Sequence, residues 1–175
     1  MSVSIEQLRD LHRPFPAGHI HWRAQTVVDG GGKGVRALAL AYLDSRDVQD
    51  RLDSVLGPEN WQSKHYDANG KMACSIGVKI GDEWIWKSDG AGDTDVEKEK
   101  GAFSDALKRA AVHWGIGRYL YDLGNTWVPC SIRMKDGKPA LSAKGKLQFL
   151  KFTDDPWKHV HNAQSFLPKL KEAAE

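Results

Sequence analysis

The sequence predicts an α+β fold in which an antiparallel three-stranded meander packs on one long helix. Apolar residues alternate with small or polar ones over Met72–Ile80, which predicts a half-buried strand. The Asn69-Gly70 pair that precedes this strand favours a two-residue hairpin turn. Beyond the third strand, apolar residues recur at helical spacing from Phe103 to Trp114. The predicted core is therefore β-β-β-α, with flanking helices.

The composition is that of a globular protein. Of the 175 residues, 41% are hydrophobic, which is enough for a substantial core. We expect that core over residues 1–125, followed by a basic extension over residues 126–175 that packs on the core or forms a subunit contact. Up to residue 130 the chain has 16 Lys and Arg against 18 Asp and Glu, and beyond it 9 against 5. The net charge of +2 is too small to indicate nucleic acid by itself.

Cysteine usage and hydropathy limit the cellular setting. Cys74 and Cys130 are too few for a disulfide framework and lack metal-ligand spacing, which favours a reducing compartment. No apolar run approaches the ~18 residues of a membrane span, and the N-terminus has no signal-peptide pattern. We expect a soluble, cytoplasmic protein that has no contact with a membrane.

The N-terminal segment predicts a short helix and a strand. Ser4 can cap a helix that runs to Leu11 and turns Ile5, Leu8 and Leu11 to one side, and Pro14 and Pro16 lie beyond its end. The segment 19–23 alternates enough for a short strand. Its two histidines suggest a metal site, but a plain edge strand is favoured because zinc needs three or four ligands.

A glycine-rich stretch follows at Asp29–Gly34 and must form a loop. It lacks the spacing of a nucleotide-binding P-loop. Two interpretations stay open: a hairpin connection, or a loop whose N–H groups and Lys33 approach a phosphate backbone. Val35–Leu43 predicts a strand covered on both faces, and Asp44 or Ser45 can cap a helix that ends at Leu56.

The meander should have two unlike faces. Its strands are predicted at Trp61–Asp67, Met72–Ile80 and Glu83–Ser88. The middle strand turns small residues and Lys79 to the face opposite its apolar side, so a ligand could approach that face closely. Trp84 and Trp86 share one face of the third strand. We expect these two rings in the core or a subunit interface rather than stacked on bases.

The long helix, predicted over residues 93–123, has an acidic start and a basic pair. Thr94 or Asp95 can cap it, and Gly115 and Gly117 break its regular course. Phe103, Leu107, Ala110 and Trp114 should form the buried stripe. Lys108 and Arg109 lie outside that stripe, and Lys100 lies on the same row as Lys108. One interpretation of the pair is a solvated helix face, with Asp105 and Arg109 paired at i, i+4; the other is a cation site for phosphates.

The residues after Leu123 show weaker secondary-structure patterns. Trp127–Ile132 favours a strand, 135–138 a turn, Ala143–Phe152 a short helix, and the segment from Trp157 to the end a marginal helix.

Two segments resemble a known family. Residues 103–123 read F-S-D-A-L-K-R-A-A-V-H-W-G-I-G-R-Y-L-Y-D-L, and residues 35–62 read V-R-A-L-A-L-A-Y-L-D-S-R-D-V-Q-D-R-L-D-S-V-L-G-P-E-N-W-Q. Both resemble single-strand-annealing proteins of the Rad52 superfamily, in particular the bacterial DNA-damage-response (DdrA-type) branch and its phage relatives. The resemblance covers roughly residues 10–125.

The resemblance implies a ring-forming homo-oligomer that binds single-stranded DNA in a basic groove and anneals complementary strands without ATP or any cofactor. Homologous recombination and DNA repair would be its setting, and a single-strand-binding protein or recombinase a further partner. The DNA-binding residues that it implies are Lys108, Arg109, Lys100, Arg23 and Tyr42, and Lys33 and Arg36 complete the predicted set. One turn after the basic pair this chain has Val112 and then His113, where the family has a further basic residue.

Two other functions stay open. An end-protecting oligomer would bind DNA without pairing strands. A nuclease could hold Mg²⁺ at the acidic cluster 89–99 through Asp89, Asp93, Asp95, Glu97 and Glu99, although capping of the helix explains several of these acids. No nucleophile–base constellation is recognisable, so we expect a protein that is not an enzyme.

Overall fold

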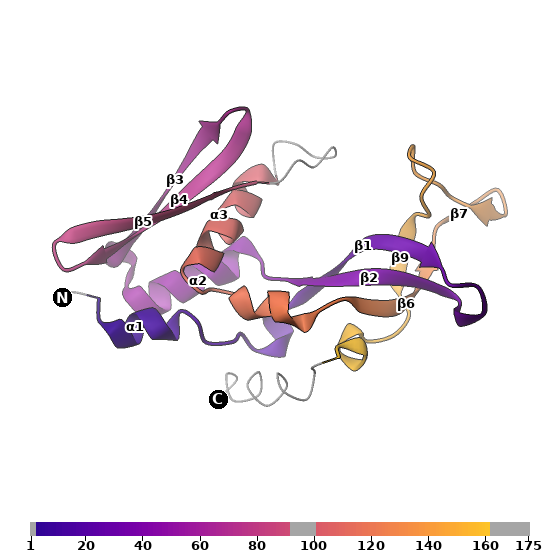
Figure 1. The fold of residues 1–175 in the computed structure, drawn as a ribbon, viewed down its shortest axis with the longest axis horizontal. Coiled ribbons are helices and arrows are strands. Elements are labelled where there is room, and N and C mark those ends of the chain that lie inside the picture. Colours follow the sequence, from indigo (N-terminus) through magenta and orange to yellow (C-terminus); the bar gives the residue numbers. More distant parts are fainter. Residues whose placement is uncertain (1–2, 92–100, 162–175) are drawn as a thin grey trace. The chain divides into compact units, whose positions relative to one another are not determined.

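The computed structural model describes residues 3–91 and 101–161, which form two compact units. Unit 1 comprises residues 1–19 and 43–119, and unit 2 comprises residues 20–42 and 120–175. Figure 1 shows the elements of both units. The chain therefore crosses between the units twice in its first 43 residues. The functional boundary predicted at residue 125 does not follow this division, and it stays a prediction.

Unit 1 contains the predicted meander. Strands β3 (Trp61–Ala68), β4 (Lys71–Ile80) and β5 (Glu83–Gly90) form an antiparallel sheet in the order β3-β4-β5. Asn69 and Gly70 connect the first two strands with φ of 57° and 78°. Positive φ at both positions is what a type I′ turn requires, so the hairpin prediction is confirmed.

Helix α3 (Ala102–His113) covers one face of this sheet (Figure 1). Its buried residues are Ala106, Leu107, Ala110 and Ala111, and they pack on a sheet face where Ile76 and Val78 are fully buried. The proposed capping residues Thr94 and Asp95 lie outside the described residues.

The prediction that Phe103 belongs to the buried stripe is wrong. Its side chain is 50% exposed, and its ring contacts the His65 ring at 5.1 Å between centroids. His65 Nε2 also lies 3.1 Å from the Phe103 carbonyl oxygen. Helical periodicity gives the direction of a side chain but not where the sheet ends. Phe103 lies in the first turn of α3, against the edge strand β3, where the sheet covers only part of the ring.

Two further helices complete unit 1. Helix α1 (Ile5–Asp10) begins at the predicted cap Ser4, whose hydroxyl accepts from the Gln7 N–H at 3.2 Å. Leu11 is fully buried, but Ile5 is 70% exposed, so the predicted apolar side is correct only at its C-terminal end. Helix α2 (Ser45–Leu56) has the predicted cap Asp44 and the predicted end, and it buries Val48, Leu52 and Leu56. The 3₁₀ turns η1 (Ala17–His19) and η3 (Pro58–Asn60) belong to the connections.

Unit 2 is built on a second antiparallel sheet. Its strand order is β1-β2-β6-β9, from β1 (His21–Asp29), β2 (Val35–Tyr42), β6 (Thr126–Ile132) and β9 (Phe149–Phe152). The turn η2 (Gly31–Lys33) joins β1 to β2. A two-stranded hairpin, β7 (Met134–Lys135) with β8 (Lys138–Pro139), follows β6 and contains the predicted turn. The 3₁₀ segment η4 (Arg118–Leu123) begins in unit 1 and ends in unit 2, and η5 (Pro156–His159) belongs to unit 2.

Three predictions for the connecting and C-terminal segments differ from the structure over the described residues. His19 lies in a 3₁₀ turn, and the strand after it is longer than predicted, because it pairs with the whole of β2. The helix predicted at Ala143–Phe152 is absent from this described segment. Gly145 adopts a φ of 71° in a turn, and β9 then pairs with β6. The helix predicted from Trp157 is a 3₁₀ turn at Pro156–His159, and residues 162–175 lie outside the described residues. No helix in the described ranges is long and apolar enough to cross a membrane.

Candidate nucleic-acid interface

The predicted basic pair lies in the middle of α3. Arg109 is exposed and Lys108 is half-buried. Both are flanked by buried residues, Ala106 and Leu107 before them and Ala110 and Ala111 after them. The buried neighbours fix the helix against the sheet, so the backbone positions of the two cations are set by core packing. Such a pair can contact phosphate oxygens without reading base identity.

Arg109 faces a carboxylate of the sheet. Its Nη2 donates to Asp89 Oδ1 at 3.2 Å, and His113 Nε2 lies 3.5 Å from Asp89 Oδ2. Partial burial favours the neutral acid. The Gly90 N–H, Arg109 and His113 outweigh that effect and lower the pKa of Asp89 below its ordinary value. Asp89 therefore stays charged near neutral pH and occupies one side of the Arg109 guanidinium. The predicted i, i+4 partner of Arg109 was Asp105, whereas the observed one comes from β5.

Two cations that are not among the predicted site residues contact the C-terminal end of α3. Arg118 donates to the carbonyl oxygens of Val112 and His113 at 2.6–3.0 Å, and Lys87 Nζ donates to His113 O at 3.0 Å. Lys87 also lies 4.2 Å from the centroid of the Trp114 ring. Burial, and then the charge of Arg118, lower the pKa of Lys87. These groups satisfy the terminal carbonyls and complement the helix dipole.

The glycines after α3 make this capping possible. Gly115 has a φ of 93°, and a Cβ at that position would clash with the His12 ring. Trp114 Nε1 donates to the Ile76 carbonyl oxygen of β4 at 3.1 Å. The segment W-G-I-G-R at residues 114–118 thus ends α3. Its arginine caps the last carbonyl groups of the helix, and its tryptophan joins the helix end to β4. The sequence signal for Arg118 was its place directly after the two glycines.

In unit 2 the predicted residues lie on the β1–β2 hairpin. His21 pairs with Tyr42 and Arg23 with Leu40, so Arg23 and Tyr42 project from the same face of the hairpin. The His21 and Tyr42 rings are 5.5 Å apart between centroids. Arg36 shares this face at the other end of β2, and its Nε is buried without a hydrogen-bond partner among the described residues.

Lys33 lies exposed at the tip of the same hairpin. The loop uses its own N–H groups: Gly30 N donates to Gly34 O, Lys33 N to Gly30 O and Gly34 N to Gly31 O, while Gly31 N donates to the Asp29 carboxylate. These N–H groups are therefore not directed toward a ligand. Of the two interpretations of the loop, the structure supports the hairpin connection, and the side chain of Lys33 remains as a candidate phosphate contact.

Other chemistry that the sequence suggested is tested only in part. Lys100 and four acids of the cluster lie outside the described residues, and the fifth acid, Asp89, faces Arg109 and His113. Both cysteines are free and buried. Burial raises the pKa of Cys74 to about 11 and raises that of Cys130 above its ordinary value, so both thiols stay protonated near neutral pH. His19, considered above as a metal ligand, instead lies 2.7 Å from Asp47.

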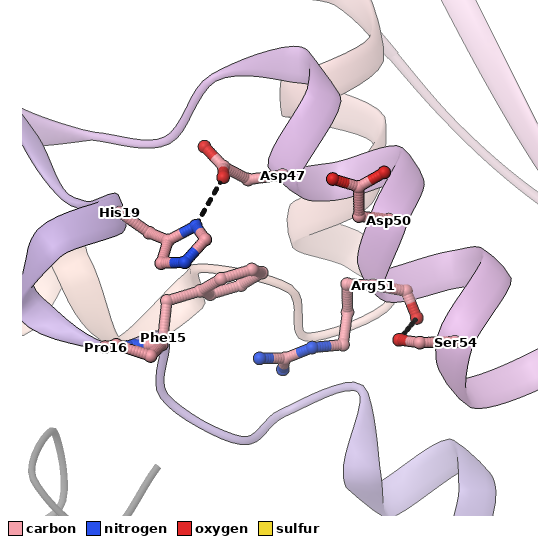
Figure 2. Close-up of a pocket in the computed structure, with 7 residues that line it drawn as sticks. All are labelled: Phe15, Pro16, His19, Asp47, Asp50, Arg51 and Ser54. Carbon is pink, nitrogen blue, oxygen red and sulfur yellow. Dashed lines mark hydrogen bonds and ion pairs between the residues drawn. The ribbon is translucent and has the colours of Figure 1, made fainter. Parts of the chain in front are cut away.

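A separate pocket in unit 1 lies between η1 and α2 (Figure 2). Arg51 holds its guanidinium 3.9 Å from the centroid of the Phe15 ring and donates to the Arg13 carbonyl oxygen at 2.6 Å. His19 Nδ1 and Asp47 Oδ1 face each other across the same pocket. These contacts tie η1 and the segment before it to α2, so Arg51, His19 and Asp47 act as structural contacts in this pocket.

Comparison with known proteins identifies the family. A profile described as "Rad52/22 family double-strand break repair protein" matches residues 5–139. The chain belongs to the Rad52/22 family. It is also similar to a protein named single-stranded DNA-binding protein DdrA from Deinococcus deserti, with 39% identity over 130 residues. The protein of the same name from Deinococcus radiodurans is 37% identical over 129 residues. Each comparison covers 73% of this chain and 62% or 60% of the relative, so the chain spans about three fifths of these relatives.

This membership confirms the predicted family and places α3, with its basic pair, inside the matched region. The mixed α+β architecture is consistent with it. The match begins in α1 and ends in β8, so it includes elements of both compact units.

Proposed function

We propose that this Rad52/22 family member binds single-stranded DNA through phosphate contacts from Lys108 and Arg109. In this proposal it pairs complementary strands without ATP, in homologous recombination and repair. Family membership supports the setting, and the names of the Deinococcus relatives support the ligand. The whole-protein activity is part of the proposal, because the chain spans only part of those relatives.

The observation that carries the proposal is the position of the basic pair. The two cations lie on a helix whose opposite side is buried and whose last turn is capped by Arg118 and Lys87. A rigidly held cation loses little conformational freedom when a phosphate binds, so more of the contact energy appears as affinity. Backbone contacts leave base edges free, and annealing requires free base edges.

The remaining features of the proposal come from the family resemblance. The protein forms a ring-shaped homo-oligomer, uses no cofactor, catalyses no bond cleavage and acts in the cytoplasm. A single-strand-binding protein or a recombinase is its proposed partner. Arg23, Tyr42 and Lys100 are proposed as further DNA contacts on the same ground, and Lys33 and Arg36 of the β1–β2 hairpin complete the predicted set.

The test is an annealing assay with complementary oligonucleotides carrying a fluorophore and a quencher, in the absence of ATP. The wild-type chain should accelerate quenching above the spontaneous rate, and Lys108→Ala with Arg109→Ala should abolish the acceleration. Lys135→Ala with Lys138→Ala, which removes two exposed lysines of the β7–β8 hairpin, serves as the charge-matched control. Affinity that stays constant between about 50 and 200 mM salt would contradict phosphate contacts, because released counterions make such binding salt-dependent.

A second candidate is protection of single-stranded DNA without annealing. The observation that favours it is that the names of the relatives state binding and mention no pairing of strands. An exonuclease challenge separates the two functions. Protection of a labelled strand at protein concentrations that leave the annealing rate at its spontaneous value would support this candidate over annealing.

A further inference from the structure

The β3-β4-β5 sheet of unit 1 has one face that α3 does not cover. The pairing register decides which side chains share it: Gln62 and Trp86 both pair with Gly77, Lys64 pairs with Ser75, and Trp84 pairs with Lys79. Side chains at paired positions project from the same face of a sheet. The opposite face contains Lys87 and Asp89, whose side chains contact His113 and Arg109 of α3. We call the face with Lys64, Tyr66, Gly77, Lys79, Trp84 and Trp86 the outer face.

Charge is segregated between the two faces. The three strands contain four lysines, and three of them, Lys64, Lys71 and Lys79, project from the outer face. The three acidic residues of the strands, Asp67, Glu83 and Asp89, all project from the face that α3 covers. The outer face is therefore purely cationic over its whole strand surface, although the chain as a whole has a net charge of only +2.

Aromatic rings lie among these lysines. Tyr66 is 44% exposed, and Trp84 and Trp86 are half-buried with centroids 6.3 Å apart and planes 33° apart. A Cβ on Gly77 would lie 2.9 Å from three ring atoms of Trp86, so this indole lies directly on the glycine backbone. Lys64 Nζ lies 4.3 Å from the centroid of the Trp86 ring. The two tryptophans therefore lie outside the core of unit 1, which was one of the two places predicted for them.

We propose that the outer face binds a single-stranded polynucleotide, whose bases stack on Trp84, beside the Trp86 ring that Gly77 and Lys64 already cover, and whose phosphates contact Lys64 and Lys79. Charge complementarity selects a polyanion, and partly exposed rings among lysines on a floor of small residues suit unpaired bases. This site deepens the proposed function but uses a different contact from the basic pair. Lys108 and Arg109 hold phosphates from the helix side of the sheet, whereas the outer face holds the flat surfaces of bases. A strand bound at the outer face would have its bases stacked on the protein, so those bases would not be free to pair.

The first test compares two probes: a short oligothymidylate and an abasic oligomer of the same length, which lacks bases but keeps every phosphate. It is done in the Lys108→Ala, Arg109→Ala background, so that the helix contacts are already removed. We expect residual binding to oligothymidylate, weaker binding to the abasic probe, and a loss of at least about fivefold when Trp84→Ala is added. Ile85→Ala is the matched control, because Ile85 lies on the same strand, is 40% exposed and projects from the opposite face.

Charge variants test the lysines while both tryptophans stay in place. Lys64→Glu with Lys79→Glu should reduce residual binding and lower its salt dependence, whereas Lys135→Glu with Lys138→Glu, at exposed positions of unit 2, should not. An oligoribouridylate arm tests whether the site distinguishes RNA from DNA. Equal binding of oligothymidylate and the abasic probe would overturn the inference, because stacking would then contribute nothing.

Photocrosslinking locates the contact independently. An oligonucleotide with 5-iodouracil should crosslink to the peptide that contains Trp84 and Trp86. Crosslinks confined to α3 would overturn the outer-face site and leave the proposed function standing. Crosslinks on β5 in a protein that fails to anneal would support the site while the annealing proposal fails. A smaller assembly for Trp84→Ala in light scattering would also overturn it, since the face would then be a contact between copies.

Discussion

The basic residues of α3 and those of the β1–β2 hairpin illustrate two ways of presenting cations. On α3, Lys108 and Arg109 are adjacent and lie on a helix with four buried residues. On the hairpin, Arg23 and Arg36 lie near opposite ends of the paired strands, and Lys33 lies in the exposed connection. The first arrangement is concentrated and held by a core, and the second is dispersed over a strand pair and its tip.

The difference teaches how much each cation should contribute to phosphate binding. A side chain on a rigid element loses less freedom on binding, and two adjacent cations can contact neighbouring phosphates of one strand. Lys33 adds its charge from a loop of six residues, four of them glycine, where ordering the side chain and the loop offsets part of the gain. We therefore expect the energetic weight of binding to lie on α3, and the following variants test that expectation.

Trp114→Ala should have the largest effect, because the ring is buried and its Nε1 bonds to the Ile76 carbonyl oxygen of β4. We expect a loss of about 3–5 kcal/mol in the free energy of unfolding, measured by urea titration. DNA affinity should fall with it, since the basic pair depends on this anchor. Ile85→Ala, at a partly exposed site, should cost less than half as much. Equal costs for the two variants would show that Trp114 is not the anchor.

Lys108→Ala with Arg109→Ala should come next, with a loss of single-strand affinity of about 100-fold and no change in the free energy of unfolding beyond about 1 kcal/mol. Two charge-assisted hydrogen bonds of about 1.5 kcal/mol each account for this size. Fluorescence anisotropy with a labelled oligonucleotide measures it, and the slope of log affinity against log salt should become shallower by about two. A wild-type slope in the double variant would show that neither cation contacts phosphate.

Lys33→Ala should have a smaller effect, about twofold to fivefold in affinity, because the loop is exposed and its N–H groups are used internally. The same anisotropy titration measures it. Arg23→Ala, on the paired part of the hairpin, is the comparison. A loss for Lys33→Ala as large as that for the α3 double variant would reverse the ranking of the two regions.

Local sequence patterns were sufficient for the elements that depend on local chemistry. The Ser4 cap, the Asn69-Gly70 turn and the helix after Asp44 were all predicted and are present. Each depends on residues within one or two turns of each other, where capping and positive φ determine the conformation. The family-specific segment around Lys108 and Arg109 was also identified from sequence.

Features that depend on distant partners could not be predicted. β9 forms because it pairs with β6, about twenty residues earlier, and no local pattern in a lysine-rich stretch shows this partner. The exposure of Phe103 depends on where β3 ends, and the ion pair of Arg109 depends on Asp89, twenty residues away on a strand. The division into two units also follows from long-range pairing. The β1–β2 hairpin belongs to unit 2, unlike the residues before and after it, because β2 pairs with β6.

Asp89→Asn should have the smallest effect on single-strand affinity, and the direction of that change is informative. The carboxylate accepts from Arg109 at 3.2 Å and carries a charge that opposes a phosphate at the same guanidinium. Its removal should raise single-strand affinity by up to about fivefold, measured by anisotropy at neutral pH. The reason is that Arg109 no longer has to leave the Asp89 carboxylate before it binds a phosphate. A fall in affinity would show that Asp89 positions Arg109 for the phosphate instead of competing with it.

The pH dependence of stability gives a second measurement on the same carboxylate. Since the pKa of Asp89 is lowered in the folded state, its contribution to stability is complete above the unfolded-state pKa of about 3.9 and is lost as the pH falls through the lower folded-state value. The Arg109 side of the pair is 44% exposed, so the contribution should stay below about 1 kcal/mol. Urea titrations at pH values above and below this range should therefore show a slightly shallower acid loss of stability for Asp89→Asn than for wild type. A steeper loss would mean that the carboxylate is not held charged by its neighbours, and the competition between Asp89 and phosphate at Arg109 would then have no electrostatic basis.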